Sequence, residues 1–332
     1  MDQMRVVAGV DGGGTRTRAA LVDESGRVLG LGEAGPSNYG DVGLAGTQES
    51  IRLALSRAGC EPQPGRGPQP LAGAFLGLGN VVSPADRATI RHLVCELGLA
   101  PADHVLVDHD IRIALAGGLA GRPGIVLIVG TGSACYGRRA DGRSWRAGGW
   151  SYLLDDAGSG YYLGLQAMIA TVRAADGRGA PTLVADRVLQ RLGLSEADEI
   201  MRRLYHDGLS RAEIAALAPL TIDAAEQRDA VAAEIIERGA DELSLMVATV
   251  ARRLEFGLDP VMVTVSGGLA TAGAAYVAPL QAAIRRRLPA VELVEPALPP
   301  VLGAALLALE DIGIPASPPL VAQLRAQRDR CC

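Results

Sequence analysis

The chain has 332 residues, which at about 150 residues per domain corresponds to roughly two domains. Hydrophobic residues make up 48% and charged residues 21%, so the chain can bury a core and does not have the composition of a disordered protein. The formal net charge of -5 argues against general binding to nucleic acids or anionic membranes. All 32 residues counted as Lys or Arg are arginine. This lack of lysine excludes a Walker-type phosphate loop, a pyridoxal Schiff base, class I aldolase chemistry and the protein-kinase lysine.

The cysteines and the apolar segments predict a soluble cytoplasmic protein. The 5 cysteines lack the spacing of a zinc site, and an odd number is more typical of a reduced compartment than of a disulfide framework. The first residues reach Asp11 too early for the apolar segment of a signal peptide. No apolar run approaches the ~18 residues that span a membrane.

The first part of the chain predicts a mixed sheet covered by helices. Short apolar runs separated by turn signals predict a three-stranded meander, at residues 5–10, 17–22 and 27–32. A helix is expected over 42–58, ended by Gly59, and the Pro- and Gly-rich residues 61–70 predict a surface loop. Strand, helix and strand follow, at 71–78, 84–97 and 104–108. This order is typical of the α/β class.

A second unit is expected to begin at Gly124 and to repeat the start of the first. An apolar strand at 124–129, a Gly/Thr turn and a strand at 134–139 reproduce the pattern of the N-terminal hairpin. Residues from about 157 to 257 predict mostly helix, with a long Ala-, Glu- and Arg-rich segment at 223–256. The remaining expected elements are a strand at 261–265 and a helix at 301–312 after two prolines.

Two glycine-rich turns occupy equivalent places in these units. Their residues are Asp11, Gly12, Gly13, Gly14 and Thr15 in the first and Gly130, Thr131, Gly132 and Ser133 in the second. Either turn alone would most often be a tight hairpin. Glycines, however, also let backbone N–H groups turn inward as an anion-binding nest, and Asp11 could hold a metal-bound water. Two facing nests could hold the β- and γ-phosphates of a nucleotide in a chain without lysine.

These motifs resemble a known superfamily. The runs DGGGTRT (11–17), VLIVGTGSAC (126–135) and VSGGLATAG (265–273) resemble the phosphate 1, phosphate 2 and adenosine motifs of the actin–hexokinase ATPases. Within that superfamily, GPSNYG (35–40) and RAGGWSYLLDDAGSG (146–160) are similar to the N-acetylglucosamine kinase branch of the BadF/BadG/BcrA/BcrD-type ATPases. The motifs occur in family order between about residue 5 and residue 312.

The resemblance implies two RNase H-like (actin-like ATPase) α/β domains with a central interdomain cleft. The first domain would comprise residues 1–118, with a C-terminal helix at 301–332 packing back on it. The second would comprise 119–300 with a helical insertion. The implied activity is transfer of phosphate from ATP, with Mg²⁺, to the 6-hydroxyl of an amino sugar. The expected partners are the sugar and ATP, with no nucleic acid and no membrane, and the helical segment 180–257 offers a face for a homodimer.

The resemblance also implies roles for individual residues. Asp110 matches the catalytic base, although a carboxylate at a strand end before a helix can also be an N-cap. The matches to sugar contacts are Asn38, Gly149, Trp150 and Asp156. Gly267 and Gly268 match the adenosine site, where a strand-end turn is the alternative. Asp11 would hold Mg²⁺ through water.

One motif departs from the family pattern and leaves the substrate open. Asp155-Asp156-Ala157 stands where Gly-Asp-Glu is usual, so N-acetylglucosamine, glucosamine and N-acetylmuramic acid all remain candidates. Two other functions are compatible with the fold. One is an ATPase that activates a dehydratase or reductase through an iron–sulfur cluster, for which the cysteines lack the usual spacing. The other is a non-catalytic sugar sensor; such proteins usually carry an added DNA-binding domain, for which a first strand near residue 5 is expected to leave no room.

Overall fold

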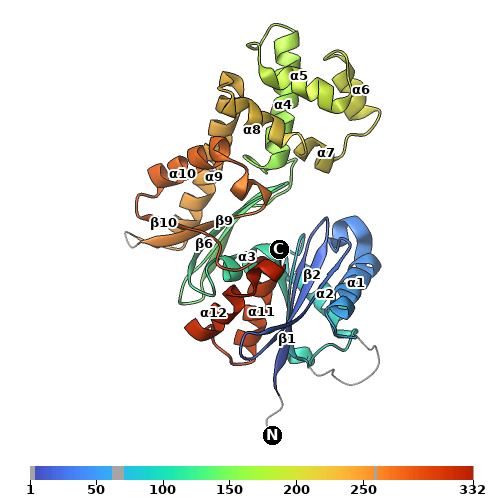
Figure 1. The fold of residues 1–332 in the computed structure, drawn as a ribbon, viewed down its shortest axis with the longest axis vertical. Helices are drawn as coiled ribbons and strands as arrows, with labels where there is room; N and C mark the ends of the chain where they lie inside the picture. Colours follow the sequence, from blue (N-terminus) through green and yellow to red (C-terminus); the bar gives the residue numbers. More distant parts are fainter. Residues whose placement is uncertain (1–3, 62–70, 258–259, 332) are drawn as a thin grey trace. The chain divides into compact units, whose positions relative to one another are not determined.

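The computed structural model shows two compact units (Figure 1). It describes residues 4–61, 71–257 and 260–331, so most of the loop expected at 61–70 lies outside the described residues. The first unit comprises Met1–Pro123 with Glu295–Cys332, and the second comprises Gly124–Val294. The unit boundaries therefore lie a few residues from those expected at 118 and 300.

The first unit is built on a five-stranded sheet in the order β3-β2-β1-β4-β5. The strands are β1 (Val6–Gly12), β2 (Thr17–Asp23), β3 (Val28–Ala34), β4 (Leu71–Leu78) and β5 (Val105–His109). The first three form the expected antiparallel meander, whereas β4 runs parallel to β1 and β5 runs parallel to β4. Gly12, Leu78 and His109 are paired across the three parallel strands, so these strands end at one edge of the sheet.

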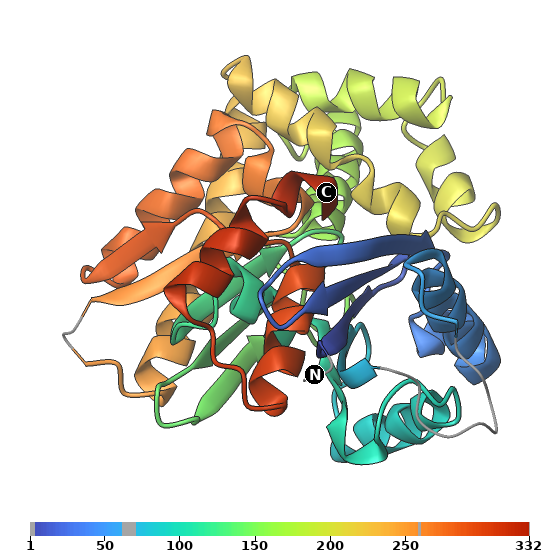
Figure 2. The same ribbon diagram turned by 60° about the horizontal axis from the view of Figure 1, so that its bottom comes forward.

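Helices cover both faces of this sheet (Figure 2). They are α1 (Tyr39–Arg57), α2 (Pro84–Cys95), η1 (Ala102–His104), α3 (Asp110–Gly118), α11 (Pro300–Asp311), α12 (Pro318–Arg325) and η3 (Arg328–Cys331). Because side chains alternate along a strand, Val10 packs in one buried cluster with Ile51 of α1, and Val7 packs in another with Leu306 of α11. The segment 295–331 thus completes the core of the first unit.

The C-terminal region is two helices rather than the single helix expected over 301–332. Helix α11 ends at Asp311, and α12 begins at Pro318. Gly313, with φ 84°, and Pro315 lie between them, and neither continues a helix readily.

The second unit repeats the topology of the first. Its sheet has the order β10-β9-β6-β7-β8, and its strands are β6 (Gly124–Val129), β7 (Ser133–Arg138), β8 (Ser144–Gly148), β9 (Val261–Ser266) and β10 (Val291–Val294). Strands β6 to β8 form an antiparallel meander, β9 runs parallel to β6, and β10 runs parallel to β9. The repeated hairpin of the sequence is therefore part of a repeated five-stranded sheet. Strands β8 and β10 were not predicted, because β8 has five residues without an apolar run and β10 has only four residues.

Helices form two layers in the second unit. They are α4 (Gly160–Ala175), α5 (Leu183–Leu192), α6 (Glu199–Tyr205), α7 (Arg211–Ala215), α8 (Ala218–Glu226), α9 (Ala230–Arg253), η2 (Gly268–Thr271) and α10 (Ala274–Arg287). Helices α9 and α10 pack on the sheet, while α4 to α8 share a further buried cluster. The mostly helical character expected from about 157 to 257 is confirmed. The Ala-, Glu- and Arg-rich segment at 223–256 is divided between α8 and α9, because Arg228 has φ 66° and the carboxylate of Asp229 accepts the N–H of Ala232 to cap a new helix.

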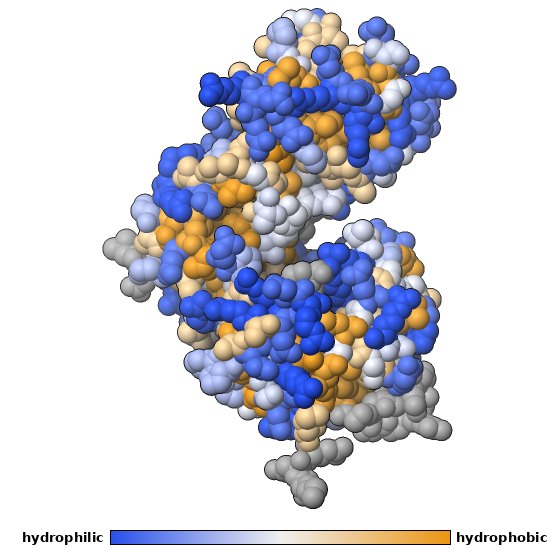
Figure 3. Space-filling model, viewed as in Figure 1, coloured by the Kyte–Doolittle hydropathy of each residue, from blue (hydrophilic) through white to orange (hydrophobic). Residues whose placement is uncertain are grey.

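These observations confirm the α/β class with two similar sheets. On the face seen in Figure 3, hydrophilic side chains are interspersed with smaller apolar areas in each unit. Among the described helices, none is both long enough and apolar enough to cross a membrane.

The packing of α11 generates the first prediction. A Cβ on Gly303 would overlap the carbonyl oxygen of Ile113 in α3 and come within 2.8 Å of the Cα of Gly117. Gly303→Ala should therefore lower the free energy of unfolding by about 1–3 kcal/mol, measured by urea denaturation. Gly35→Ala is the control, since its added methyl would meet only Ser50 Oγ at 3.9 Å. Equal stability of the two variants would contradict the close packing of α11.

Candidate active site

The first glycine loop follows β1 and has its carbonyl groups tied to neighbouring segments. The carbonyl of Gly12 accepts the N–H of Gly79 at 2.8 Å. The carbonyl of Gly13 accepts the N–H groups of Ser37 and Asn38, at 3.0 and 3.2 Å. A Cβ on Gly12 would overlap Ser37 Oγ, so this close approach requires glycine.

The N–H groups of this loop differ from its carbonyl groups in their hydrogen bonding. Within the described residues, the N–H groups of Gly14 and Thr15 donate no hydrogen bond, and both residues are exposed. Successive unpaired N–H groups next to a strand end form the kind of nest that binds phosphate oxygens.

Hydroxyl groups fasten the segment that carries Asn38. Thr17 donates to the carbonyl of Gly35 and Ser50 donates to the carbonyl of Pro36, each at 2.7 Å. The hydroxyl of Thr47, which donates to Gly43 at 2.9 Å, also lies 3.3 Å from the carbonyl oxygen of Ser37. Asn38 itself caps α1, because its Oδ1 accepts the N–H of Gly40 at 3.1 Å. Asn38 is therefore a helix cap in this structure, and this hydrogen bond fixes the orientation of its side-chain amide.

Asn80 is a neighbour of this amide that the sequence did not single out. It follows β4 with φ 69°, a conformation that asparagine tolerates better than most residues, and it is exposed. Its Nδ2 lies 2.5 Å from the position of a Cβ on Gly40, and Oδ1 of Asn38 lies 3.4 Å from the same point. Two asparagine side chains thus border Gly40. Only the end of a predicted strand hinted at Asn80.

Three adjacent residues at the start of α3, Asp108, His109 and Asp110, have different surroundings. His109, not Asp110, is the N-cap: its Nδ1 accepts the N–H of Arg112 at 3.1 Å. Asp108 accepts Arg87 Nε at 2.8 Å and an Arg112 guanidinium N–H at 2.7 Å. Burial alone would raise the pKa of Asp108, but His109, Arg112 and the hydrogen bonds to it hold that pKa below its ordinary value.

Asp110 instead lies by the glycine loop. Its Oδ2 is 3.7 Å from the position of a Cβ on Gly79, a point equally distant from the carbonyl oxygen of Gly12. Because β1, β4 and β5 end at one edge, Asp110 and Asp11 are brought together there. Of the two alternatives for Asp110, the capping role is taken by His109.

This arrangement changes the pKa of Asp11. Burial raises its pKa from 3.8 to about 7, the negative charge of Asp110 adds to the rise, and Arg18 and Arg16 oppose it. Two neighbouring carboxylates of this kind suit Mg²⁺, which prefers oxygen ligands and would offset their repulsion. The residues present therefore fit a magnesium site.

The second glycine loop follows β6 and has the same construction. The carbonyl of Gly130 accepts the N–H of Gly160 at 2.8 Å, and the carbonyl of Thr131 accepts the N–H of Tyr161 at 3.1 Å. Within the described residues, the N–H groups of Thr131 and Gly132 donate no hydrogen bond. The first turn of α4 thus holds the carbonyl side of a second nest.

Asp156 is buried against this loop. It has φ 68°, and its side chain is 3% exposed. Its Oδ1 accepts the N–H of Ser133 at 2.9 Å, and its Oδ2 accepts a guanidinium N–H of Arg211 at 2.7 Å. A Cβ on Gly132 would lie 2.5 Å from Arg211 and 2.7 Å from Asp156, so the ion pair packs directly on the loop. In this structure, both oxygens of Asp156 bind protein groups; a sugar contact of Asp156 stays a prediction.

Arg211 is a functional candidate that sequence reasoning missed. It begins α7, 55 residues beyond Asp156, outside every motif. Its guanidinium also lies over the ring of Tyr152, 5.6 Å from the centroid. No local pattern points to it, because its role depends on a tertiary contact.

The segment after β8 presents exposed aromatic and apolar side chains. Gly149 has φ 74°, and a Cβ there would lie 3.1 Å from Cβ of Ala134. Trp150 is 62% exposed, with the guanidinium of Arg146 stacked 4.9 Å from its ring. Leu153 and Leu154 are also exposed and were not predicted to be.

The end of β9 lies against the end of β6. Gly267 has φ 101°, and a Cβ there would overlap the carbonyl of Val129. Gly268 starts η2, and no atom lies within 4 Å of the Cβ position on that residue. The predicted adenosine glycines therefore adjoin the Gly130 loop in the second unit.

The predicted site residues thus form one group in each unit. The first group contains Asp11, Gly12, Gly13, Gly14, Thr15, Asn38 and Asp110. The second contains Gly130, Thr131, Gly132, Gly149, Trp150, Asp156, Gly267 and Gly268.

Comparison with known proteins identifies the family. The sequence pattern of the BadF/BadG/BcrA/BcrD ATPase family matches residues 8–308. The chain belongs to this family. The resemblance drawn from the sequence motifs is confirmed, and with it the use of ATP as the family's nucleotide.

Its relatives include sugar kinases. An N-acetylmuramic acid/N-acetylglucosamine kinase of Clostridium acetobutylicum is 32% identical over 80% of this chain and 86% of that protein. An N-acetyl-D-glucosamine kinase of Dictyostelium discoideum is 29% identical over 92% of this chain and 98% of that protein. Among solved structures, a candidate N-acetylglucosamine kinase of Chromobacterium violaceum is 29% identical, with a TM-score of 0.70 over 92% of this chain and 99% of that one.

The raised pKa of Asp11 predicts a pH effect on stability. Because the folded pKa lies above the unfolded value of 3.8, the contribution of Asp11 to stability is complete below that value and declines as the pH rises to about 7. Asn cannot ionise and so does not lose this stability. In metal-free buffer, the free energy of unfolding of Asp11→Asn, relative to that of the unmodified protein, should therefore increase from about pH 5 to about pH 8. Urea denaturation at both pH values measures this.

The control should show no pH dependence over this range. Hydrogen bonds from Ser83 and Tyr39 lower the pKa of Asp86 below its ordinary value of 3.8, so its contribution to stability is already complete at about pH 5, and Asp86→Asn should lose the same stability at both pH values. A pH-independent difference for Asp11→Asn would contradict the raised pKa.

The Asp156–Arg211 pair predicts a large effect on stability. Arg211→Met leaves a buried carboxylate without its partner and should cost about 3–5 kcal/mol in urea denaturation. Adding Asp156→Asn to that variant should restore part of the loss. Arg203→Met is the control from the same helical region, because it breaks a pair with the half-exposed Glu213 and should cost about 1 kcal/mol or less. Similar losses in both single variants would show that the Asp156 pair has no special role.

Proposed function

We propose that this protein is an ATP-dependent amino-sugar kinase that phosphorylates the 6-hydroxyl of N-acetylglucosamine or glucosamine. The observation that carries the proposal is the placement of Asp110 at the carboxyl edge of the first sheet, beside Asp11 and the Gly12–Thr15 loop. Asp108 is engaged by two arginines and His109 caps the helix, so neither competes with Asp110 for the role of base.

The nucleotide is assigned to the two glycine loops. In this proposal the N–H groups of Gly14, Thr15, Thr131 and Gly132, which donate to no described residue, donate to the β- and γ-phosphates. They supply the stabilisation that lysine provides in other nucleotide sites. Gly267 and Gly268, which adjoin the Gly130 loop, leave open backbone for the adenosine.

Asp11 is assigned to magnesium, through a bound water. When bound, Mg²⁺ neutralises phosphate charge that develops during transfer. Asp11 must be ionised to hold it, and at a pKa of about 7 its own environment favours the charged form only weakly.

Asp110 is the general base. Its carboxylate accepts the proton of the sugar 6-hydroxyl while that oxygen bonds to the γ-phosphorus, and the bond from phosphorus to the bridging oxygen breaks to release ADP. The carboxylate becomes a carboxylic acid, and the products are ADP and the sugar 6-phosphate. Asn38 and Gly149, together with Trp150 and Asp156, are assigned to positioning the sugar, which is worth several powers of ten in rate when the reacting atoms are aligned.

Cysteine burial disfavours the iron–sulfur alternative. Cys135 is fully buried, and burial raises the pKa of its thiol. Cys60 is also buried, and burial raises its pKa in the same way. Cluster ligands are thiolates, so these two residues are poor candidates for a cluster. The alternative of a non-catalytic sugar sensor would be excluded by measured phosphorylation of a sugar.

The decisive experiment is a sugar panel with ATP and Mg²⁺, with the product identified by mass. The panel contains N-acetylglucosamine, glucosamine and N-acetylmuramic acid. Asp110→Asn should reduce sugar-dependent kcat by at least about 100-fold because the base is lost, while affinity for an ATP analogue stays within about threefold. Asp103→Asn, which changes an exposed carboxylate of η1, should keep normal turnover.

Two results would contradict the proposal. Sugar-independent ADP release, with no phosphorylated sugar in the panel, would argue for an ATPase. Normal turnover of Asp110→Asn would place the base elsewhere.

A further inference from the structure

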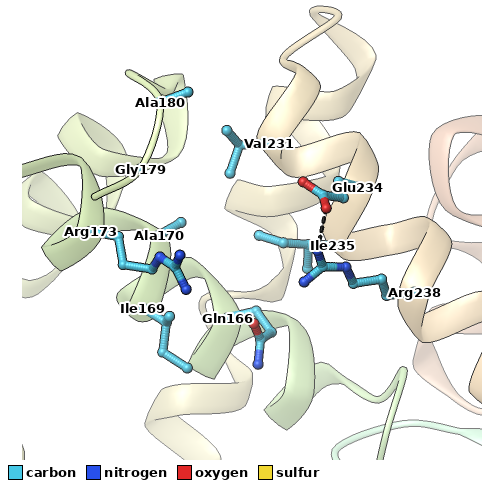
Figure 4. Close-up of a pocket in the computed structure, with 10 residues that line it drawn as sticks. All are labelled: Gln166, Ile169, Ala170, Arg173, Gly179, Ala180, Val231, Glu234, Ile235 and Arg238. Carbon is cyan, nitrogen blue, oxygen red and sulfur yellow. Dashed lines mark hydrogen bonds and ion pairs between the residues drawn. The ribbon is translucent and has the colours of Figure 1, made fainter. Parts of the chain in front are cut away.

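A pocket outside the predicted site lies between α4 and α9 (Figure 4). Its volume is about 300 Å³, at the lower end of small-molecule sites. Each helix lines it with four residues spaced as one face of a helix: Gln166, Ile169, Ala170 and Arg173 from α4, and Val231, Glu234, Ile235 and Arg238 from α9. Gly179 and Ala180 also line the pocket, and their small size leaves space within it.

The pocket combines an apolar floor with two guanidinium groups. Ala170 and Ile235 are buried, whereas Arg173 and Arg238 are exposed and stand on opposite walls. Figure 4 shows the guanidinium of Arg173 directed from α4 toward α9.

The charges in the pocket do not cancel. Arg238 forms an ion pair with Glu234, which lines the same pocket. Asp176 lies near Arg173, but its carboxylate is hydrogen-bonded by Arg178 at 2.6 Å. The two arginines and one glutamate that line the pocket therefore leave one positive charge.

Both walls are attached to the segment that holds the second glycine loop. The first turn of α4 donates to the carbonyls of Gly130 and Thr131. On α9, Gly239 follows Arg238 directly, and a Cβ on Gly239 would lie 2.8 Å from the Cα of Gly158. A molecule that changes the spacing of α4 and α9 would therefore act on this loop.

We propose that this pocket binds a small organic monocarboxylate and thereby modulates nucleotide binding by the Gly130 loop. The single excess positive charge matches one carboxylate better than a doubly charged phosphate ester, and a guanidinium pairs with a carboxylate through two parallel hydrogen bonds. A short aliphatic chain suits the floor of Ala170 and Ile235. The binding stands on the pocket alone, while the effect on nucleotide rests on the function proposed above.

The test separates these two parts. Isothermal titration calorimetry of the full chain without nucleotide uses propanoate, 3-methylbutanoate and hexanoate, with 3-methylbutanamide as the uncharged counterpart. We expect saturable binding of at least one carboxylate, with a Kd on the order of millimolar, and binding of the amide at least tenfold weaker.

Variants then locate the binding. Arg173→Gln should weaken it at least tenfold, and Ala170→Leu, which fills the pocket, should abolish it. Arg191→Gln is the matched control, because Arg191 is an exposed arginine of α5 that does not line the pocket. Urea denaturation of each variant shows whether the fold is kept.

The carboxylate should also change the affinity for an ATP analogue at least twofold, and this effect should be absent in Ala170→Leu. Binding without that change would remove the regulatory part alone. No saturable binding in the panel, equal binding of the amide, or equal binding by folded Ala170→Leu would overturn the site. A change in solution mass caused by Arg173→Gln, with no carboxylate binding, would instead make the pocket an interface between copies.

Discussion

In both glycine loops two successive carbonyl oxygens accept hydrogen bonds from other segments, while two successive N–H groups donate none to any residue that the structure describes. Gly79, Ser37 and Asn38 hold the first loop, and the first turn of α4 holds the second. A peptide that has its carbonyl fastened in this way presents its N–H in a fixed direction, so the loop is organised for an anion before one binds. Glycine is required because a Cβ at Gly12, Gly132 or Gly267 would occupy space that a neighbouring segment fills.

Arginine does structural work around these loops in a chain that has no lysine. Arg87 and Arg112 neutralise Asp108, and Arg211 neutralises the buried Asp156. Asp11 is different, since burial and the charge of Asp110 raise its pKa. In the proposed function, Asp108 stabilises the fold through its two arginines, whereas Asp11 and Asp110 are the carboxylates assigned to magnesium and to proton transfer.

The two units share a topology but are elaborated differently. Each has a meander followed by two parallel strands, and parallel strands bring their carboxyl ends to one edge. The first unit is completed by α11 and α12 from the end of the chain, and the second by the helices between α4 and α8. That helical addition supplies Arg211 and one wall of the pocket between α4 and α9, and it contacts the Gly130 loop although nearly all of it lies outside the sequence motifs.

The local parts of this protein could be predicted from its sequence. Strand-ending glycine turns, the segment around Asn38 and the strand–helix junction at Asp110 depend on residues that are neighbours in the chain, and the motifs that revealed the family are of this kind. Contacts between distant residues could not. The five-residue strand β8, the four-residue strand β10 and the pair of Asp156 with Arg211 leave no periodic or compositional signal. Their stability comes from partners that only the folded chain brings into range, because hydrogen bonds, ion pairs and buried packing act over a few ångströms and not along the sequence.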